Sequence, residues 1–335
     1  MDSIRKPYLL FLGDVTDRTD AKTALGLRDW AGADVVGQYR MPDCTVDLGI
    51  PDLRPAEAAA RGARSLVVGI AAVGGALKPS WIACLVEALE AGLDIVSGQH
   101  SRLASFPALA EAAGRTERRL IDVRVPPAGL PVGTGRKRVG KRLLTVGTDC
   151  ALGKKYTALT LARALRDRDV PATFRASGQT GILIGGSGVP IDAVVADFLA
   201  GAAETLSPDA GDPNHWDVVE GQGSLFHPGY AAVTLGLLHG SQPDAIVLCH
   251  DPRRTCIDGY PDFPIPSLRE AIDLYLTLGR LTNPAIRCVG ISLNTSGMAE
   301  AERQAVLERT AAETGLPCVD PIATGVGAIV ERLFA

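Results

Sequence analysis

The sequence predicts an α/β protein of two domains, each built on a parallel β-sheet. Short apolar runs alternate with amphipathic helical segments along most of its 335 residues, and this alternation favours parallel strands with helices on both faces. The length suggests two domains rather than one. With 46% hydrophobic and 21% charged residues, the chain has an ordinary globular composition with enough apolar material for buried cores.

The first half of the chain opens on a buried strand. Residues 8–13 form an apolar run that ends in Gly-Asp, the usual end of a parallel strand. Residues 81–91 predict a helix, because apolar residues from Ile82 to Leu89 recur at helical spacing and Gly92 follows as a C-terminal cap. Further strands are expected at 33–36, 65–70 and 93–98.

A stretch rich in proline and glycine, residues 126–142, interrupts this alternation and is typical of a linker. We therefore expect an N-terminal domain over residues 1–130, a linker over 131–141 and a second domain over 142–335. The stretch also holds a basic cluster, Arg136-Lys137-Arg138 with Lys141-Arg142. This cluster is either a solvated charge run or a source of cations for a second phosphate of a bound ligand.

The alternation of strands and helices resumes after the linker and continues to the end of the chain. Strands are expected at 142–146, 172–176, 216–220, 244–249, 286–292 and 317–319. Helices are expected at 154–168, 190–206, 230–239, 267–280, 299–314 and 325–334.

The clearest motif follows the first strand of the second half. A small-residue loop, a Gly-Lys pair and the start of a helix together predict a phosphate cradle, in which loop N–H groups and a lysine bind one anion. The usual pattern, G-x-x-x-x-G-K-[ST], ends in a hydroxyl that binds Mg²⁺. Here Lys155 takes the place of that hydroxyl, and the first glycine lies one residue early. The candidate cofactor-binding residues are Gly147, Thr148, Asp149, Cys150, Gly153, Lys154, Lys155, Tyr156 and Thr157.

Together with the alternating strands and helices, this loop predicts the fold class: an N-terminal Rossmann-like domain followed by a P-loop NTPase-like domain with a parallel sheet. The first strand is not followed by G-x-G-x-x-G, so the first domain gives little indication of a dinucleotide. We expect it to contribute substrate-binding groups across an interdomain cleft instead. The candidates are Asp14, Arg40 and His100.

A second motif is the apolar strand that ends at Glu220 and is followed by Gly221-Gln222-Gly223-Ser224. Ligands of open α/β sheets lie at this edge, where the acid could hold Mg²⁺ or water in an NTPase, or take a proton from an amine in acyl transfer. His227 on the next loop is a second acid–base candidate, with a solvated loop histidine as the alternative. Glu220 and His227 are the expected catalytic residues.

Three polar residues at the ends of neighbouring strands complete the expected pocket. Arg175 and Gln179 follow one strand, and Arg253 follows another; guanidinium groups suit the carboxylates of a substrate. Cys249, His250 and Cys256 lie close in sequence but lack the spacing of a zinc site, so no metal is expected.

The composition and the net charge restrict the classes of partner that we expect. The net charge of −4 gives no indication of nucleic acid, and no apolar run reaches the roughly 18 residues of a membrane span. Met1–Lys6 is not followed by a signal-peptide core. The seven scattered cysteines indicate reduced thiols, so we expect a cytoplasmic protein, and a homo-oligomer is the default expectation.

Two families share these motifs. Gly147-Thr148-Asp149 and Val219-Glu220-Gly221 resemble the corresponding segments of dethiobiotin synthetase. A resemblance over nearly the whole chain is to the D-glutamate N-acetyltransferase family. It rests on the four segments Ser97-Gly98-Gln99-His100, Gly147-Thr148-Asp149-Cys150, Gly178-Gln179-Thr180-Gly181 and Val219-Glu220-Gly221-Gln222-Gly223-Ser224, with His227-Pro228 after them.

The second resemblance implies transfer of an acetyl group from acetyl-CoA to the amine of D-glutamate, with the product passing to a separate N-acetyl-D-glutamate racemase. CoA carries a pyrophosphate and a 3′-phosphate, which need cations and N–H groups but no metal, so the unusual loop fits. One alternative is an ATP-dependent kinase or ligase of the dethiobiotin-synthetase type, in which Thr148 or Thr157 would replace the missing ligand of Mg-ATP. Another is a non-catalytic nucleotide-sensing or metallochaperone protein.

Overall fold

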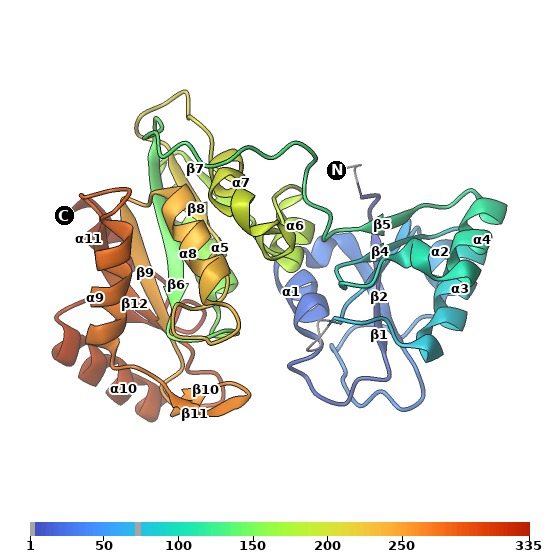
Figure 1. Cartoon of the computed structure of the whole chain (residues 1–335). Helices are drawn as coiled ribbons and strands as arrows, with labels where there is room; N and C mark the ends of the chain where they lie inside the picture. Colours follow the sequence, from blue (N-terminus) through green and yellow to red (C-terminus); the bar gives the residue numbers. More distant parts are fainter. Residues whose placement is uncertain (1–3, 71–74) are drawn as a thin grey trace. The chain divides into compact units, whose positions relative to one another are not determined.

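The computed structural model describes residues 4–70 and 75–335, so residues 1–3, part of the N-terminal segment Met1–Lys6 discussed above, lie outside the described residues. The chain forms two compact units. The N-terminal unit comprises residues 1–125 and 182–190, and the C-terminal unit comprises 126–181 and 191–335. Figure 1 shows residues up to 125 in blue to teal, residues 182–190 of the same unit in yellow-green, and the rest of the second unit in green to red.

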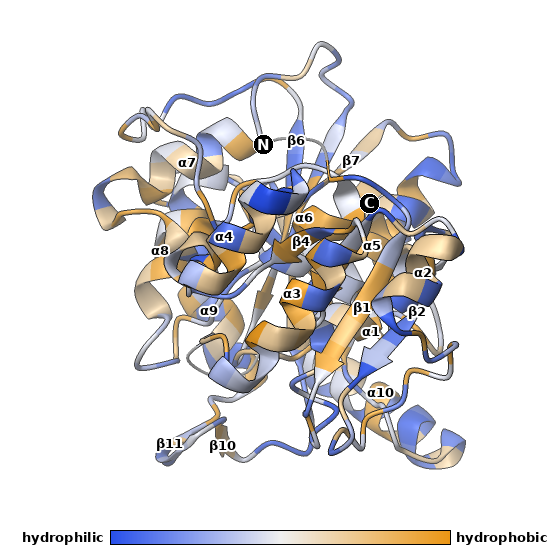
Figure 2. Cartoon of the chain, turned by 90° about the vertical axis from the view of Figure 1, so that its right-hand side faces the viewer, coloured by the Kyte–Doolittle hydropathy of each residue, from blue (hydrophilic) through white to orange (hydrophobic). Residues whose placement is uncertain are grey.

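A five-stranded parallel sheet forms the centre of the N-terminal unit, in the order β2-β1-β3-β4-β5. Every residue of β1 is buried, because this strand lies between β2 and β3, and Figure 2 shows it in the orange of hydrophobic residues. The strands are β1 (Tyr8–Gly13), β2 (Val35–Arg40), β3 (Ser65–Val68), β4 (Asp94–Ser97) and β5 (Leu120–Asp122).

Helices and short 3₁₀ turns connect these strands. They are α1 (Lys22–Trp30), α2 (Pro55–Ala60), α3 (Ile82–Glu90), α4 (Pro107–Thr116), η1 (Gly32–Asp34), η2 (Pro79–Trp81) and η3 (Leu103–Ser105). The predicted helix over 81–91 is confirmed. The strand predicted at 33–36 is largely wrong in its bounds. Residues 32–34 form a 3₁₀ turn, and the strand continues through polar Gln38 and Arg40, which do not match an apolar run.

The C-terminal unit holds a six-stranded parallel sheet in the order β13-β12-β9-β6-β8-β7. Its strands are β6 (Lys141–Gly147), β7 (Ala172–Arg175), β8 (Trp216–Val219), β9 (Ala245–His250), β12 (Arg287–Leu293) and β13 (Cys318–Val319). A separate antiparallel pair joins β10 (Cys256–Ile257) and β11 (Tyr260–Pro264). The six predicted strands of this half are confirmed, since each bound lies within one residue of the observed one.

The helices of this unit are α5 (Lys154–Arg166), α6 (Gln179–Gly185), α7 (Leu199–Leu206), α8 (Ala231–Ser241), α9 (Leu268–Gly279), α10 (Glu300–Thr314) and α11 (Gly327–Phe334), with 3₁₀ turns η4 (Ile191–Ala193) and η5 (Ala196–Phe198). On one face of the sheet, Leu161 and Leu165 of α5 and Ile329 of α11 pack in one buried core with Val247 of β9. The predicted helix over 190–206 is wrong in its first half, which forms the two turns, and α6 was not predicted.

The basic cluster is divided in the structure: Arg138 and Arg142 are buried, whereas its other members, Arg136, Lys137 and Lys141, are exposed. Arg142 is 1% exposed and its guanidinium donates to Ser207 Oγ at 2.9 Å, and Lys137 pairs with Asp244 at 2.7 Å. The cluster lies before and at the start of β6, whereas the loop follows the other end of that strand, about 20 Å away along seven residues. The interpretation as a solvated charge run therefore holds for the three exposed residues, whereas the buried Arg138 and Arg142 stabilise the start of the sheet. The role of the cluster toward a second phosphate stays a prediction.

Within the described ranges, none of the helices has the length and apolar character needed to cross a membrane.

Candidate active site

The phosphate loop lies at the carboxyl edge of the C-terminal sheet, between the end of β6 and the start of α5. Gly153, the residue before α5, has φ +100°, a left-handed conformation that glycine adopts at little cost. At Gly147, an added Cβ would lie 3.0 Å from Asp149 O and 3.1 Å from Lys154 Nζ. The two glycines therefore allow the loop to fold tightly around the lysine, as a phosphate cradle requires.

Lys154 is folded back over the loop. Its ammonium donates to Asp149 O at 2.7 Å, and the side chain is buried. Burial lowers the pKa of Lys154, since the charged form loses its hydration. A phosphate beside this ammonium would restore a favourable environment for the charge, so the loop is suited to an anion.

Asp149 ties the loop to the segment that leads into β10. Its Oδ1 accepts from the backbone N–H of Cys150 at 2.6 Å, and its Oδ2 accepts from Arg254 Nη1 at 2.5 Å and from the N–H of Asp258 at 2.9 Å. Asp149 is thus a buried structural carboxylate. Arg254 is the cation that reaches the loop, whereas the predicted Arg253 pairs with Asp251 at 2.8 Å.

The two threonines that could replace a magnesium ligand are buried and already bonded within the protein. Thr148 Oγ1 lies 2.9 Å from His250 Nδ1, and Thr157 Oγ1 lies 2.8 Å from Ser292 Oγ. At the usual hydroxyl position, the Lys155 ammonium lies 5.2 Å from the centroid of the Tyr156 ring. This arrangement supports the interpretation of the loop as a phosphate site without a threonine or serine ligand for Mg²⁺.

Glu220 follows β8, directly beside the phosphate loop. Its neighbour Gly221 donates its N–H to Thr145 Oγ1 on β6 at 3.0 Å, and a Cβ on Gly221 would lie 3.1 Å from Lys154 Cδ. Glu220 is 4% exposed, and burial raises its pKa to about 7 while the Lys155 charge opposes the shift. A carboxyl with this pKa can accept or release a proton at neutral pH.

The residues around Glu220 hold the carboxylate in one position. Its Oε2 accepts from the N–H groups of Ser177 at 3.1 Å and Gly178 at 3.2 Å. At Gly181, an added Cβ would lie 2.2 Å from the same oxygen, so only glycine fits there. The Gly178-to-Gly181 segment and the segment after β8 therefore pack against each other, and Gln179 begins α6 at this point.

His227 lies between two tyrosines and is buried, which lowers its pKa. Its ring is 4.4 Å from that of Tyr230 and 5.0 Å from that of Tyr260, between centroids. Its Nδ1 accepts from the N–H of Gly229 at 3.0 Å, so the neutral ring carries its proton on Nε2. In this state Nε2 is a hydrogen-bond donor rather than a base.

Tyr275 positions the His227 loop against the phosphate loop, and no motif in the sequence pointed to this residue. Its hydroxyl donates to Gly147 O at 2.8 Å and accepts from the N–H of Leu225 at 3.2 Å. The side chain is wholly buried, and burial raises the pKa of Tyr275 to about 12, so the hydroxyl keeps its proton.

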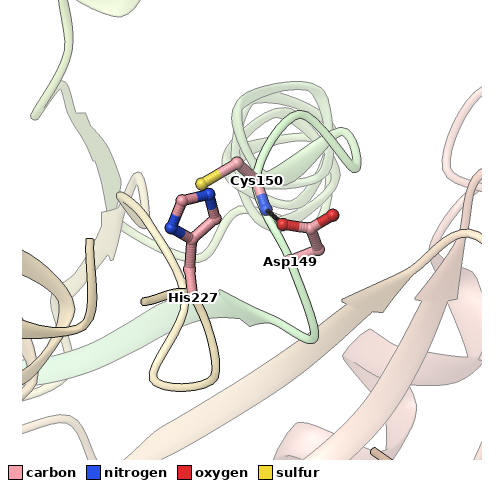
Figure 3. A group of neighbouring side chains, drawn as sticks. All are labelled: Asp149, Cys150 and His227. Carbon is pink, nitrogen blue, oxygen red and sulfur yellow. Dashed lines mark hydrogen bonds between the residues drawn. The ribbon is translucent and has the colours of Figure 1, made fainter. Parts of the chain in front are cut away.

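Asp149, Cys150 and His227 form a group whose ligand atoms all lie within 4.8 Å of one another. Figure 3 shows the sulfur of Cys150 beside the imidazole ring. The group offers three possible metal ligands, but both Asp149 oxygens already accept hydrogen bonds, and Lys154 and Arg254 place two cations beside it. These cations favour an anion over a metal ion at this point.

The remaining candidates are held in pairs. In the N-terminal unit, Asp14 accepts from Lys78 at 2.9 Å, Arg40 donates to Asp52 at 2.7 Å, and His100 Nε2 lies 2.7 Å from Arg124 Nη1. In the C-terminal unit, Arg175 donates to Asp217 at 2.7 Å. The structure brings together the phosphate loop, Glu220, His227 and Gln179. The substrate-binding roles of Asp14, Arg40, His100, Arg175 and Arg253 stay predictions.

The fold and the site define a two-unit α/β protein with a P-loop-type C-terminal unit. The family model described as "Domain of unknown function (DUF1611_C) P-loop domain" matches residues 131–330. The model described as "Domain of unknown function (DUF1611_N) Rossmann-like domain" matches residues 39–126. The expected fold class is confirmed.

Full-length relatives extend this result. The chain is 50% identical over 332 residues to a D-glutamate N-acetyltransferase of Tritonibacter scottomollicae, covering 99% of each chain. It is 48% identical to a D-glutamate N-acetyltransferase of a Pseudoalteromonas species, covering 98% of this chain and 99% of that one. A crystal structure of a DUF1611 family protein from Anabaena variabilis has a TM-score of 0.90 at 36% identity, covering 98% of this chain and 99% of that one.

The chain therefore belongs to the DUF1611 family, the family of these D-glutamate N-acetyltransferases, and the resemblance seen in the sequence is confirmed. By this relationship it is an enzyme of the acyltransferase class.

Proposed function

We propose that this chain transfers the acetyl group of acetyl-CoA to the amine of D-glutamate. The observation that carries the proposal is the buried Glu220, with a pKa of about 7, beside a phosphate loop in a chain whose full-length relatives are named for this activity. An amine must lose a proton as it attacks a thioester. A base whose pKa lies near the working pH is the most effective acceptor for that proton.

The phosphate loop would bind the phosphates of CoA. Lys154, the loop N–H groups and the start of α5 provide the donors, and Lys155 adds a second cation beside them. CoA phosphates need no catalytic metal, which agrees with the buried, bonded hydroxyls of Thr148 and Thr157. An ATP-dependent kinase or ligase would need one of these hydroxyls to break its bond and turn toward Mg-ATP.

In the proposed reaction, the Glu220 carboxylate accepts the proton of the attacking amine. The carbonyl oxygen of the acetyl group gains negative charge, which donors such as the Nε2–H of His227 and loop N–H groups would stabilise. We place Gln179 at the amino-acid site, because it follows Gly178, whose N–H binds the Glu220 carboxylate. Arg175 and Arg253 would bind the substrate carboxylates only after exchanging their acidic partners.

The same proposal includes the biological setting expected from the sequence. The product would be consumed by an N-acetyl-D-glutamate racemase, and the enzyme would act in the cytoplasm as a homo-oligomer. The seven cysteines, all free thiols in the structure, support a reducing compartment.

Calorimetry combined with a transfer assay tests the proposal. We expect CoA and acetyl-CoA to bind without added Mg²⁺, and acetyl transfer to D-glutamate to exceed transfer to L-glutamate. Tight, Mg²⁺-dependent binding of ATP with no response to CoA would instead favour the kinase or ligase. Nucleotide binding with no turnover of either kind would favour the non-catalytic nucleotide-binding protein.

A further inference from the structure

We propose that a cavity beside the phosphate loop binds the 3′-phosphorylated adenosine of CoA. This inference rests on the proposed function and concerns how the acyl donor is recognised. The cavity has a volume of about 400 Å³ and lies in the C-terminal unit, where the end of β9, the start of α9 and the later half of α10 line it. Its volume is in the range of small-ligand sites.

Two residues of the cavity wall also contact the phosphate loop. His250 Nδ1 lies 2.9 Å from Thr148 Oγ1. Arg254 donates from Nη1 to Asp149 Oδ2 at 2.5 Å and to Cys150 O at 2.9 Å. The cavity and the loop are therefore adjacent and share these two residues.

The covalent structure of CoA fits this adjacency. One ribose carries the pyrophosphate, the 3′-phosphate and the adenine, so a molecule whose pyrophosphate occupies the loop has its adenosine end within reach of the cavity. The pantetheine arm leaves the pyrophosphate from the opposite end. The cavity is thus placed for the adenosine and not for the thioester.

Two arginines of the lining have donors that the protein does not use. Both hydrogen bonds of Arg254 come from Nη1, and Asp258 Oδ2 lies 3.9 Å from Nη2, beyond hydrogen-bonding distance. In the described part of the chain, no group forms a hydrogen bond or ion pair with the exposed side chain of Arg309 on α10. A phosphate suits both guanidinium groups, because it accepts two parallel N–H bonds.

The remaining lining suits a purine base. Ile265, Leu268 and Val306 form an apolar wall, against which the face of adenine can pack. Glu313 follows Arg309 by about one helical turn and also lines the cavity, so its carboxylate can accept a hydrogen bond from the 6-amino group of adenine. D-glutamate would bring carboxylates to the arginines, but it has little apolar surface for this wall.

The test is calorimetry on the full-length enzyme with CoA and with dephospho-CoA, which lacks only the 3′-phosphate. We expect the wild type to bind CoA more tightly by about 10-fold or more, since a hydrogen bond to a charged group contributes this much. Arg309→Ala should remove most of this preference and leave the affinity for dephospho-CoA unchanged. Arg280→Ala is the matched control, an exposed arginine at the end of α9 outside the cavity, and should keep the full preference.

A competition experiment tests the adenosine end by itself. Adenosine 3′,5′-bisphosphate has no pantetheine arm, and we expect it to displace CoA from the wild type. The same molecule should compete about 10-fold less well in Arg309→Ala.

The outcomes separate two kinds of failure. Equal affinities of the wild type for CoA and dephospho-CoA, or a full preference in Arg309→Ala, would overturn the assignment of the cavity and leave the proposed function intact. A raised KM for D-glutamate in Arg309→Ala with unchanged CoA affinity would overturn it as well, because the cavity would then hold the amino acid. An enzyme that binds neither form of CoA would overturn the proposed function itself.

Discussion

At the scale of single residues, the site depends on charges that are buried beside one another. Lys154 and Glu220 are both buried. Burial lowers the pKa of Lys154 and raises the pKa of Glu220, so it favours the uncharged form of each side chain. Burying charges costs free energy unless a partner or ligand compensates for it. Ionisable residues whose pKa values are shifted in this way cluster at functional sites.

The first prediction concerns the activity of Glu220→Gln. The amide cannot accept a proton, so kcat/KM should fall by about 10²- to 10⁴-fold. In the wild type, a plot of kcat/KM against pH should rise with an apparent pKa near 7, and this rise should be absent in the variant. Asp192→Asn is the control: Asp192 helps to raise the pKa of Glu220, so the variant should keep activity and shift the rise to lower pH.

The second prediction concerns stability. Because the pKa of Glu220 is raised from 4.5 to about 7, the folded state binds more protons than the unfolded state between these values. The free energy of unfolding therefore decreases as the pH rises through this window, by roughly 3 kcal/mol. Glu220→Gln should stabilise the protein at pH 8 and have little effect at pH 4, as measured by urea unfolding. Equal stability of the two proteins at pH 8 would contradict the raised pKa.

At the scale of elements, the carboxyl ends of β6 and β8 bring the phosphate loop and the acid together. Their backbones approach closely: an added Cβ at Gly221 would lie 1.7 Å from Thr145 O. The segment that leads into α6 closes the other side of the carboxylate through the N–H groups of Ser177 and Gly178. The glycines of these motifs thus allow the backbone to pack closely around the Glu220 carboxylate.

The third prediction tests this packing with Gly181→Ala. The new methyl would lie 2.2 Å from Glu220 Oε2, so the carboxylate must move and loses its N–H partners. A displacement of this size should lower kcat/KM by about 100-fold while CoA affinity changes little. Gly211→Ala is the matched control, because no atom lies within 4 Å of its added Cβ. Equal activities of the two variants would show that the position of the Glu220 carboxylate is unimportant.

At the scale of the whole molecule, the two ends of strand β6 have different roles. The amino end is fixed by the buried arginines of the basic cluster, and the carboxyl end opens into the phosphate loop. Sequence proximity suggested one cationic region, but an extended strand keeps its ends far apart.

The fourth prediction tests the structural role of the amino end and the binding role of the carboxyl end separately. Arg142→Lys cannot reproduce the guanidinium's bonds to Ser207 and to surrounding carbonyls, so the free energy of unfolding should fall by about 2–4 kcal/mol, with unchanged CoA affinity for the folded protein. Lys154→Ala should do the reverse and weaken CoA binding with little loss of stability. Thermal unfolding and calorimetry on both variants distinguish the outcomes. Strong loss of CoA affinity in Arg142→Lys would place the basic cluster at the ligand after all.

The sequence was sufficient to predict the elements whose local residue pattern agrees with the structure that the fold requires there. The six strands of the C-terminal half, the phosphate loop and the acid after β8 are all read from apolar runs and glycine spacing. Helix α6 and the turns before α7 were missed, because short helices rich in glycine and small residues have no strong periodicity.

By itself, the sequence determined the fold class, the family and the phosphate loop, since these depend on residue types at fixed spacing along one strand–loop–helix unit. Tertiary structure alone decided which cation reaches the loop, which tautomer His227 adopts and how strongly Glu220 holds its proton. It also placed Tyr275 between the two loops and the Cys150 sulfur beside His227. These properties arise from burial and from contacts between residues far apart in the chain, which spacing along one segment cannot encode.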